Sequence, residues 1–248
     1  MILQSMIFAA GLGTRLRPLT DTMPKALVPV AGKPLLWHVI QRMKAAGFER
    51  VVVNVHHFAQ QIIDYLDAND HFGLDIRVSD ESAALLETGG GIKKARQFFD
   101  PASPILIHNV DILSDAQLLP LLEPLCRVGR GAVLAISARE SKSGRYLLFD
   151  ADHRLVGWTN AVTGEVRSPF PDAVERAVLK APFAGIHAFH PSLFPLMDAW
   201  PDRFSIIDFY LSICREHTIL GHLGHFNLID VGKLDSLSEA DAFVKQQK

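Results

Sequence analysis

Residues 8–27, FAAGLGTRLRPLTDTMPKAL, gather glycines, two arginines and a lysine directly behind a short apolar segment. Gly11 and Gly13 allow neighbouring backbone amides to converge on an anion, because no side chain blocks the approach. Arg15 and Lys25 add positive charge to the same stretch. The pattern predicts a loop that binds phosphate, and so many donors would suit a triphosphate.

Two familiar nucleotide-binding loops are excluded by spacing. A Walker A loop needs GxxxxGK followed by Ser or Thr, and the Rossmann fingerprint needs a third glycine where this chain has Leu16. For a bare Gly-x-Gly pair, an ordinary strand-to-helix turn with surface arginines is the alternative.

A carboxylate, Asp111, is the second candidate for chemistry. It comes just after the apolar segment 105–109, which has the pattern of a buried strand. A carboxylate at such a strand end suits a hard, oxygen-seeking cation. Aspartates at strand ends also serve as caps and turn formers, so the residues alone leave both interpretations open.

The elements that must position these residues follow an α/β pattern. Apolar runs alternate with amphipathic stretches of helical spacing, as expected where helices cover a mostly parallel sheet. In the first half we expect strands at 6–10, 51–55, 76–79, 105–109 and 132–138, and helices at 35–46, 59–66, 91–99 and 116–125.

The second half of the chain changes character. Residues 146–150 and 155–159 predict a hairpin, followed by a loop over 167–171, and together they suggest a substrate lid. Further on we expect a strand at 184–190 and helices at 191–199, 206–216 and 234–248.

Composition limits the function classes. The chain has 248 residues, 48% of them hydrophobic, which predicts one large α/β domain spanning 1–248. Its formal net charge is -2 without a long basic block, which argues against nucleic acid or membrane lipid as partners. Cys126 and Cys214 lie far apart without CxxC spacing, and no apolar stretch approaches the ~18 residues of a membrane span. We therefore expect a cytoplasmic protein that binds small molecules.

The longer string GLGTRLRPLTDTMPKALVPVAGKP, residues 11–34, resembles the signature of the sugar-1-phosphate nucleotidyltransferases, GxGTRLxPLTxxxPKxLxPVxxKP. The resemblance implies a single-domain, GT-A-like and Rossmann-related fold, with a mixed sheet flanked by helices. It also implies that the nucleotide is bound mainly within 1–115 and the sugar mainly within 140–230.

Residue roles on the nucleotide side follow from the same resemblance. Within the signature it implies catalytic roles for Arg15 and Lys25 on phosphate oxygens, and nucleotide binding by Ala10, Gly11, Gly13 and Thr14. LLETGGGIKKA, residues 85–95, is similar to the family segment that meets the nucleobase and opens a helix. That similarity implies backbone contacts from Thr88, Gly89 and Gly90. From the residues alone, consecutive glycines equally mark a plain loop.

Two further segments resemble those that carry the family's metal ligands, ILIHNVDIL at 105–113 and FNLIDVGKLDSL at 226–237. They imply that Asp111 and Asp230 hold Mg²⁺ and that Asp111 is also catalytic. Val110 stands where most relatives have glycine, which bears on local backbone shape more than on the ligand.

The sugar side is implied by FAGIHAF at 183–189 and SGRYLLFD at 143–150. The candidate sugar-binding residues are Asn160, Gly185 and Asp208. Many relatives carry a Glu-Lys pair where this chain has Thr159-Asn160, which puts conventional hexose recognition in doubt. Asp208 could equally cap a helix.

The implied reaction is Mg²⁺-dependent transfer of a nucleotidyl group from a nucleoside triphosphate to a sugar-1-phosphate, by a monomer or a homodimer. LLETGGGI is most similar to the bacterial N-acetylmuramate 1-phosphate uridylyltransferases, which implies UTP. Alternatives on the same fold are a phosphocholine cytidylyltransferase and a mannose- or heptose-1-phosphate guanylyltransferase. A catalytically silent nucleotide-sugar sensor is the alternative from a different class.

Overall fold

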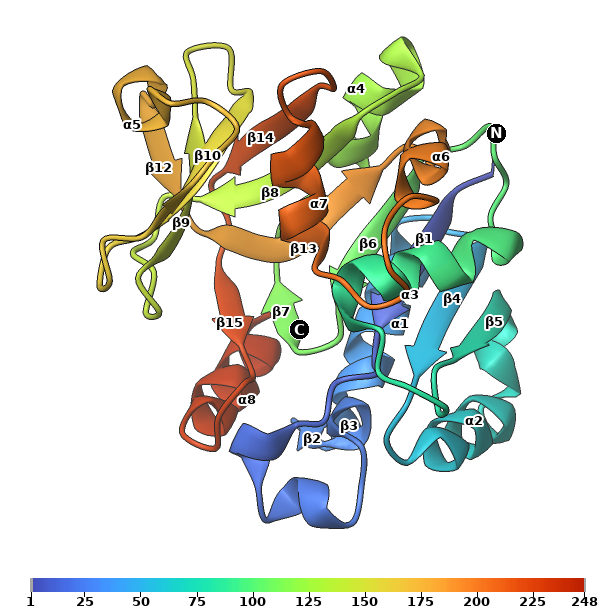
Figure 1. Cartoon of the computed structure of the whole chain (residues 1–248). Helices are drawn as coiled ribbons and strands as arrows, with labels where there is room; N and C mark the ends of the chain where they lie inside the picture. Colours follow the sequence, from blue (N-terminus) through green and yellow to red (C-terminus); the bar gives the residue numbers. More distant parts are fainter. Residues whose placement is uncertain (1, 248) are drawn as a thin grey trace.

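A seven-stranded sheet forms the centre of the computed structural model, which describes residues 2–247 (Figure 1). In spatial order its strands are β14 (Ile219–Gly224), β8 (Ala132–Ser137), β13 (Phe183–Phe189), β6 (Ile105–Asn109), β1 (Gln4–Phe8), β4 (Arg50–Val55) and β5 (Asp75–Asp80). β13 runs antiparallel to both of its neighbours, whereas the other adjacent strands pair in parallel. The expected mixed α/β sheet is confirmed.

Helices cover both faces of this sheet because its strands are apolar on both faces. Along β1, Ile7 packs into one core and Met6 into the other, as the alternation of side chains along a strand requires. The Ile7 side includes α1 (Leu35–Ala45), α2 (Ala59–Ala68), α4 (Leu119–Val128) and α8 (Ser236–Gln246). The Met6 side includes α3 (Glu87–Ala95), α6 (Phe194–Met197) and α7 (Ile206–Ile213).

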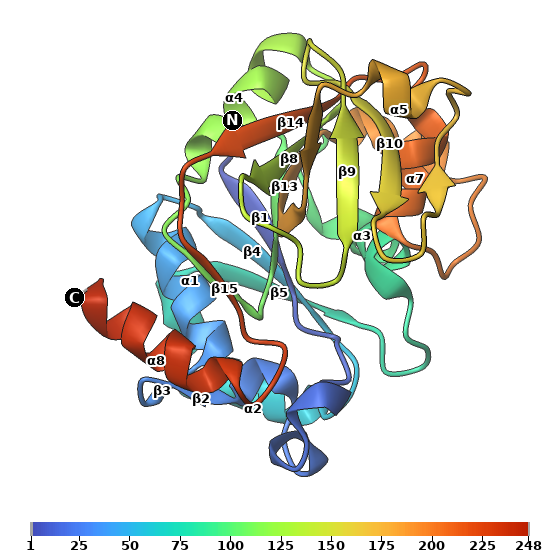
Figure 2. The ribbon, with the colours of Figure 1, turned by 90° about the vertical axis from the view of Figure 1, so that its left-hand side faces the viewer.

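A smaller sheet lies beside the main one and contains the predicted hairpin (Figure 2). Its strands in spatial order are β11 (Val166–Arg167), β10 (Leu155–Asn160), β9 (Arg145–Phe149) and β12 (Leu179–Ala181), with α5 (Ala173–Arg176) between β11 and β12 in the chain. The Gly221 amide of β14 donates to the His153 carbonyl at the hairpin turn, 2.8 Å away, and so ties the two sheets together. The strands β11 and β12 were not expected from the sequence.

Short ribbons and 3-10 turns occupy the connections. β7 (Ile112–Ser114) pairs antiparallel with β15 (Leu228–Asp230), and β2 (Pro29–Val30) pairs antiparallel with β3 (Lys33–Pro34). The 3-10 turns are η1 (Thr14–Leu16), η2 (Leu19–Asp21), η3 (Lys25–Leu27), η4 (Asp70–Gly73), η5 (Arg96–Phe98) and η6 (Pro191–Leu193). Along residues 2–247, no helix combines the length and the apolar character that crossing a membrane requires.

Several boundaries differ from the sequence expectation for physical reasons. The helix expected from residue 91 begins at Glu87, because glycine lets its first turn pack closely: a Cβ at Gly89 would lie 2.3 Å from the Phe204 ring. The helix expected over 116–125 is shifted to α4, whose N-terminus carries Pro120 in the first turn, where proline is tolerated.

Towards the C-terminus the differences are larger. The helix expected over 191–199 divides into η6 and α6, and α7 ends at Ile213 rather than Glu216. β14 was not expected, because glycines and His222 interrupt its apolar run. The closing helix is confirmed as α8, and Lys248 of the expected range lies outside the described residues.

Candidate active site

The predicted phosphate loop and Asp111 come together because they follow adjacent parallel strands. β1 and β6 pair in register up to Phe8 and Asn109, and the Val110 amide donates to the Phe8 carbonyl at 3.1 Å. The carboxyl ends of parallel strands are where open α/β sheets bind ligands. The loop that begins at Ala9 and the carboxylate at Asp111 therefore share one edge of the sheet.

The loop owes its shape to Gly13 and leaves Gly11 open. Gly13 has a φ of 64°, in the left-handed region that favours glycine, and its carbonyl accepts hydrogen bonds from the Leu16 amide and the Thr20 hydroxyl. A Cβ at position 13 would lie 2.9 Å from the Thr20 side chain, whereas a Cβ at Gly11 would meet nothing within 4 Å. The space above Gly11 is available to a ligand.

Lys25 and Asp111 form an ion pair between η3 and the end of β6. The Lys25 side chain is 10% exposed and that of Asp111 is 20% exposed. A buried ammonium of this kind is held by its partner, because an unpaired charge away from water is costly. The pair places one positive and one negative group beside the predicted phosphate loop.

Asp230, at the end of β15, lies near Asp111 although the two are far apart in sequence. The antiparallel pairing of β15 with β7 places Asp230 opposite Ile112, and the Val231 amide donates to the Asp111 carbonyl at 2.8 Å. The β7–β15 pair therefore brings together two aspartates that are far apart in sequence.

The charges around Asp230 act on one another. Although Asp230 is exposed at the cleft wall, the surrounding protein raises the pKa of its carboxyl by desolvation, and repulsion from Asp111 raises it further. Lys25, Arg15 and Arg139 oppose that rise. A Cβ at Gly232 would lie 2.8 Å from Asp230 Oδ1 and 2.9 Å from Arg15 Nη2, so the absence of a side chain at this position leaves room for both.

Two neighbouring carboxylates that repel each other fit the chemistry of a divalent cation. Among the described residues no group of three or more His, Cys, Asp and Glu side chains could enclose a metal ion. Mg²⁺ rarely needs such a cage, because it is usually held by one or two carboxylates together with water and substrate phosphates. Asp111 and Asp230 are therefore a suitable protein half of a magnesium site.

Thr88, Gly89 and Gly90 lie in the first turn of α3, and their polar groups already have partners. The amides of Gly89 and Gly90 donate to the Phe204 carbonyl at 2.8 and 3.3 Å, and the Thr88 hydroxyl accepts from the Ile206 amide at 2.9 Å. A Cβ at Gly90 would lie 1.9 Å from the Asp202 carbonyl oxygen. These glycines secure the packing of α3, and their contact with a nucleobase remains a prediction.

A cavity of about 880 Å³ opens between Arg15 and Asp230 on one side and the smaller sheet on the other. Asn160 lines it, and its side-chain oxygen accepts from the Val162 amide at 2.9 Å in the hairpin turn. This cavity is where we place the candidate active site.

Gly185 and Asp208 are not among the described residues that line this cavity. Gly185 is buried with a φ of 74°, and a Cβ there would lie 2.9 Å from both Asn109 and Ile112. Asp208 pairs with Arg167 at 2.5 Å. The structure thus gives both residues structural contacts, and their part in sugar binding remains a prediction.

Sequence reasoning missed the basic wall of the cavity. Arg139, Lys142 and Arg145 come from the β8–β9 connection and the start of β9, and Arg167 lies over the Trp158 ring at 3.9 Å from its centroid. Arg145 lies within the segment 143–150 and Arg167 begins the loop 167–171, both assigned to the substrate side from the sequence, but neither side chain was singled out there, and Arg139 and Lys142 belong to no motif.

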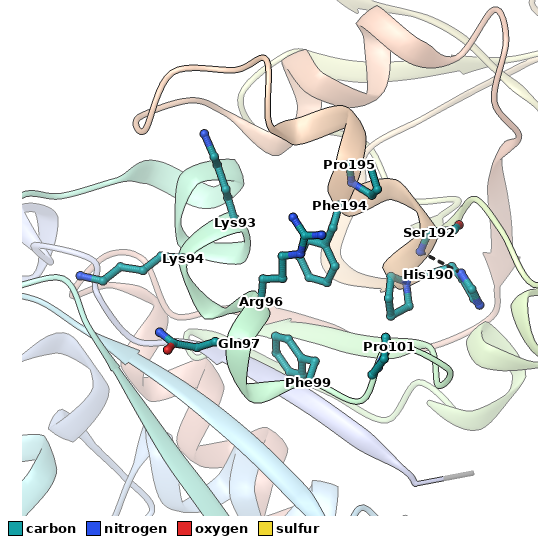
Figure 3. Close-up of a pocket in the computed structure, with 11 residues that line it drawn as sticks. Lys93, Lys94, Arg96, Gln97, Phe99, Pro101, His190, Ser192, Phe194 and Pro195 are labelled. Carbon is teal, nitrogen blue, oxygen red and sulfur yellow. Dashed lines mark hydrogen bonds between the residues drawn. The ribbon is translucent and has the colours of Figure 1, made fainter.

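A second cavity, of about 820 Å³, lies between α3–η5 and η6–α6 (Figure 3). None of the predicted site residues lines it. Its basic groups have structural partners: Lys93 donates to the Trp200 carbonyl at 2.8 Å, and Arg96 pairs with Asp198 at 3.1 Å. We therefore do not place the chemistry here.

The fold is that of an α/β protein in which the predicted phosphate loop lies at the carboxyl edge of parallel strands, beside two carboxylates. Comparison with known families goes further. The chain belongs to the nucleotidyl transferase family, whose profile matches residues 4–153.

Sequence relatives carry names of the same kind. The chain is 50% identical over 109 residues to an N-acetylmuramate alpha-1-phosphate uridylyltransferase of Caulobacter vibrioides, covering 43% of this chain and 45% of the relative. A protein of the same name from Neisseria meningitidis serogroup B is 46% identical over 114 residues, covering 46% and 48%. The chain thus spans less than half the length of these two relatives.

Two solved structures share the fold across nearly the whole chain. HddC from Yersinia pseudotuberculosis, complexed with GMP-PN, superposes with a TM-score of 0.75 at 20% identity, covering 98% of this chain and 100% of HddC. A UDP-glucose pyrophosphorylase from Acinetobacter baumanii superposes with a TM-score of 0.77 at 16% identity, covering 100% and 98%. At these identities the likeness concerns the fold alone.

Proposed function

We propose that this protein is a sugar-1-phosphate nucleotidyltransferase, which joins a nucleoside triphosphate and a sugar-1-phosphate into a nucleotide sugar and releases pyrophosphate. The observation that carries the proposal is the convergence of Arg15, Lys25, Asp111 and Asp230 beside the phosphate loop. Nucleotidyl transferase membership and the names of the relatives support the same reaction.

The chemistry needs positioning more than acid or base catalysis. A phosphate oxygen of the sugar-1-phosphate attacks the α-phosphorus of the triphosphate, and the bond to the β-phosphate breaks with its electrons leaving on pyrophosphate. The attacking group is already an anion, so no side chain has to remove its proton. The loop amides, Arg15 and Lys25 would hold the phosphates in line and balance the charge on the leaving group.

We further propose that Mg²⁺ is held by Asp111 and Asp230 and, when bound, neutralises phosphate oxygens. The support is the donor set: two adjacent carboxylates, one of which has a pKa raised by desolvation and by the other carboxylate. In the protein described, Lys25 neutralises part of this charge by pairing with Asp111.

For the substrates we propose UTP and an N-acylated amino-sugar 1-phosphate. The similarity to two relatives named N-acetylmuramate alpha-1-phosphate uridylyltransferase supports this choice. A mannose-1-phosphate guanyltransferase of Kluyveromyces lactis, 28% identical over 202 residues, keeps guanosine triphosphate and mannose 1-phosphate as the second pair to test. We also propose a cytoplasmic location, supported by the wide separation of Cys126 and Cys214 in the sequence.

The test combines purified protein with each of UTP, GTP, CTP and dTTP against glucose, mannose, N-acetylglucosamine and N-acetylmuramate 1-phosphates and phosphocholine, with and without Mg²⁺. Pyrophosphate release and the mass of the product are measured for every pair. We expect Mg²⁺-dependent release with UTP and an N-acylated amino-sugar phosphate. Nucleotide binding without pyrophosphate release from any pair would refute the enzyme and favour a silent sensor.

A further inference from the structure

Glu81, directly after β5, is a carboxylate with no exposed surface and with both of its oxygens occupied. Its exposure is 0%, Oε1 accepts from the Asn54 side-chain amide at 2.7 Å, and Oε2 accepts from the Leu86 backbone amide at 3.2 Å. Burial raises the pKa of this carboxyl against the effect of those hydrogen bonds. A buried acid of this kind needs a reason, because apolar packing would cost less.

Asn54 extends the contact to the phosphate loop. Asn54 lies in β4 at 2% exposure, and its side-chain oxygen accepts from the Ala9 amide at 2.8 Å. Because the Ala9 amide can only donate, it fixes the orientation of the Asn54 side chain. Three hydrogen bonds thus connect Ala9, at the entry to the loop, with Leu86, the residue before α3.

The backbone around Glu81 is held just as firmly. Its amide donates to the Val55 carbonyl at 2.7 Å, and the His56 ring bonds to its carbonyl at 2.6 Å. A Cβ at Gly91 would lie 2.8 Å from Glu81 Oε1, so α3 itself packs directly on the carboxylate. The Glu81 side chain therefore lies between β4, which carries Asn54, and the start of α3.

We propose that Glu81 is a positioning residue that, through Asn54, holds the phosphate loop and the first turn of α3 at a fixed distance for the nucleotide. The inference rests on the proposed function and deepens it. Only a carboxylate suits the position, because the group must accept from a donor on each side. A glutamine would turn its own NH₂ towards one of those donors, and a buried donor left without an acceptor is costly.

Comparing the KM of the sugar-1-phosphate with that of the triphosphate distinguishes a positioning role from a purely structural one. The basic wall of the cleft belongs to the smaller sheet and its connections, and neither Asn54 nor Glu81 is among the described residues that line that cavity. Loss of the connection should therefore change binding and turnover of the triphosphate while the KM of the sugar-1-phosphate stays constant.

The experiment reverses the direction of the central hydrogen bond. In the double variant Asn54→Asp with Glu81→Gln, the carboxylate now at position 54 would accept from Ala9 and from the glutamine NH₂, and the glutamine oxygen would accept from Leu86. Each single variant instead opposes two donors or two acceptors. Glu123→Gln, the same substitution on the exposed face of α4, is the matched control. Melting temperature, triphosphate affinity, kcat and both KM values are measured for all four variants and the wild type.

We expect Glu81→Gln to lower kcat/KM for the triphosphate roughly ten- to a hundredfold, the cost of one buried unpaired donor. The double variant should return to within about threefold of wild type, and Glu123→Gln should equal wild type. Wild-type kinetics in Glu81→Gln, or a folded double variant as slow as that single variant, would overturn the proposal. If Glu81→Gln does not fold, the double variant decides alone: wild-type kinetics support the proposal, and slow turnover or failure to fold overturns it. An inactive wild type would instead refute the proposed function.

Discussion

Gly11 and Gly13 lie two residues apart in the phosphate loop, and replacing each with alanine should have opposite effects on stability. Gly13 is in the left-handed region, and an added Cβ would lie 2.9 Å from Thr20, a residue only 3% exposed. Gly11 is exposed, lies outside the left-handed region and would give its Cβ nothing within 4 Å. Alanine is therefore obstructed by the protein itself at Gly13 and by nothing in the protein at Gly11.

The magnitudes follow from these two geometries. Left-handed backbone costs alanine about 1 to 2 kcal/mol, and moving Thr20 adds to this, so Gly13→Ala should lose about 2 kcal/mol of stability. For a chain of this size that loss lowers the melting temperature by roughly 4 to 8 °C. Gly11→Ala should keep or raise the melting temperature, since alanine at a compatible position restricts the unfolded chain by about 0.4 to 1 kcal/mol.

Ligand binding separates the two variants further. If a phosphate approaches the amides at Gly11, the new methyl group occupies that space and weakens triphosphate binding about 10- to 100-fold. Thermal melts without ligand and calorimetric titration with the triphosphate that wild type binds most tightly measure both effects. A Gly11→Ala protein that binds this triphosphate with wild-type affinity would refute the placement of the phosphate, whatever its melting temperature.

Four other substitutions test the charges and the core. Asp111→Asn keeps the volume of the side chain but removes its charge, and turnover at saturating substrate should fall on the order of 100-fold or more; unchanged turnover would contradict the metal assignment. Arg15→Ala and Lys25→Ala should each weaken triphosphate binding or turnover without altering the ranking of sugar-1-phosphates, and a switched ranking at undiminished nucleotide affinity would mean that the loop faces the other substrate. Burial lowers the pKa of His187 to about 3. Below about pH 6.5 the unfolded chain binds a proton at this ring that the native protein does not bind, so the free energy of unfolding decreases as the pH falls below 6.5. His187→Leu should therefore remove about 2 kcal/mol of the stability difference between pH 7 and pH 5 in urea titrations, and an unchanged difference would show that this ring does not titrate on unfolding.

The strands before the phosphate loop and Asp111 could be predicted from the sequence, whereas the tertiary contacts around these residues could not. The predicted phosphate loop and Asp111 each follow an apolar strand that was expected from the sequence, and the structure places those two strands side by side. The proximity of Asp230 came from the family resemblance. It depends on the three-residue strands β7 and β15, which are too short to carry a recognisable alternation of side chains.

Other features had no local signal. Glu81 stands in SDESAALLETGG, a stretch that has the composition of an exposed polar loop, and its complete burial arises only when β4, β5 and α3 pack around it. The resemblance assigned the glycines of the same stretch to the nucleobase. Gly89 and Gly90 are required by close packing, since a Cβ at Gly89 would meet the Phe204 ring and one at Gly90 would meet the Asp202 carbonyl oxygen, and both partners lie more than 100 residues away in sequence. Close approaches of this kind are set by tertiary packing and leave no periodic pattern.

The connection between β8 and β13 has a consequence for redesign. The whole smaller sheet, residues 138–182, leaves the main sheet at the end of β8 and returns at the start of β13, where Phe183 pairs with Ile136. Because the two ends of this insertion already lie on paired strands, closing a loop of different length between them costs little. We therefore expect that residues 138–182 can be replaced by the corresponding residues of a relative. Such a graft would change the basic wall of the cleft and leave the phosphate loop, Asp111 and Asp230 in place. A successful graft has to keep attachments such as the His153–Gly221 hydrogen bond to β14 and the Arg167–Asp208 ion pair to α7.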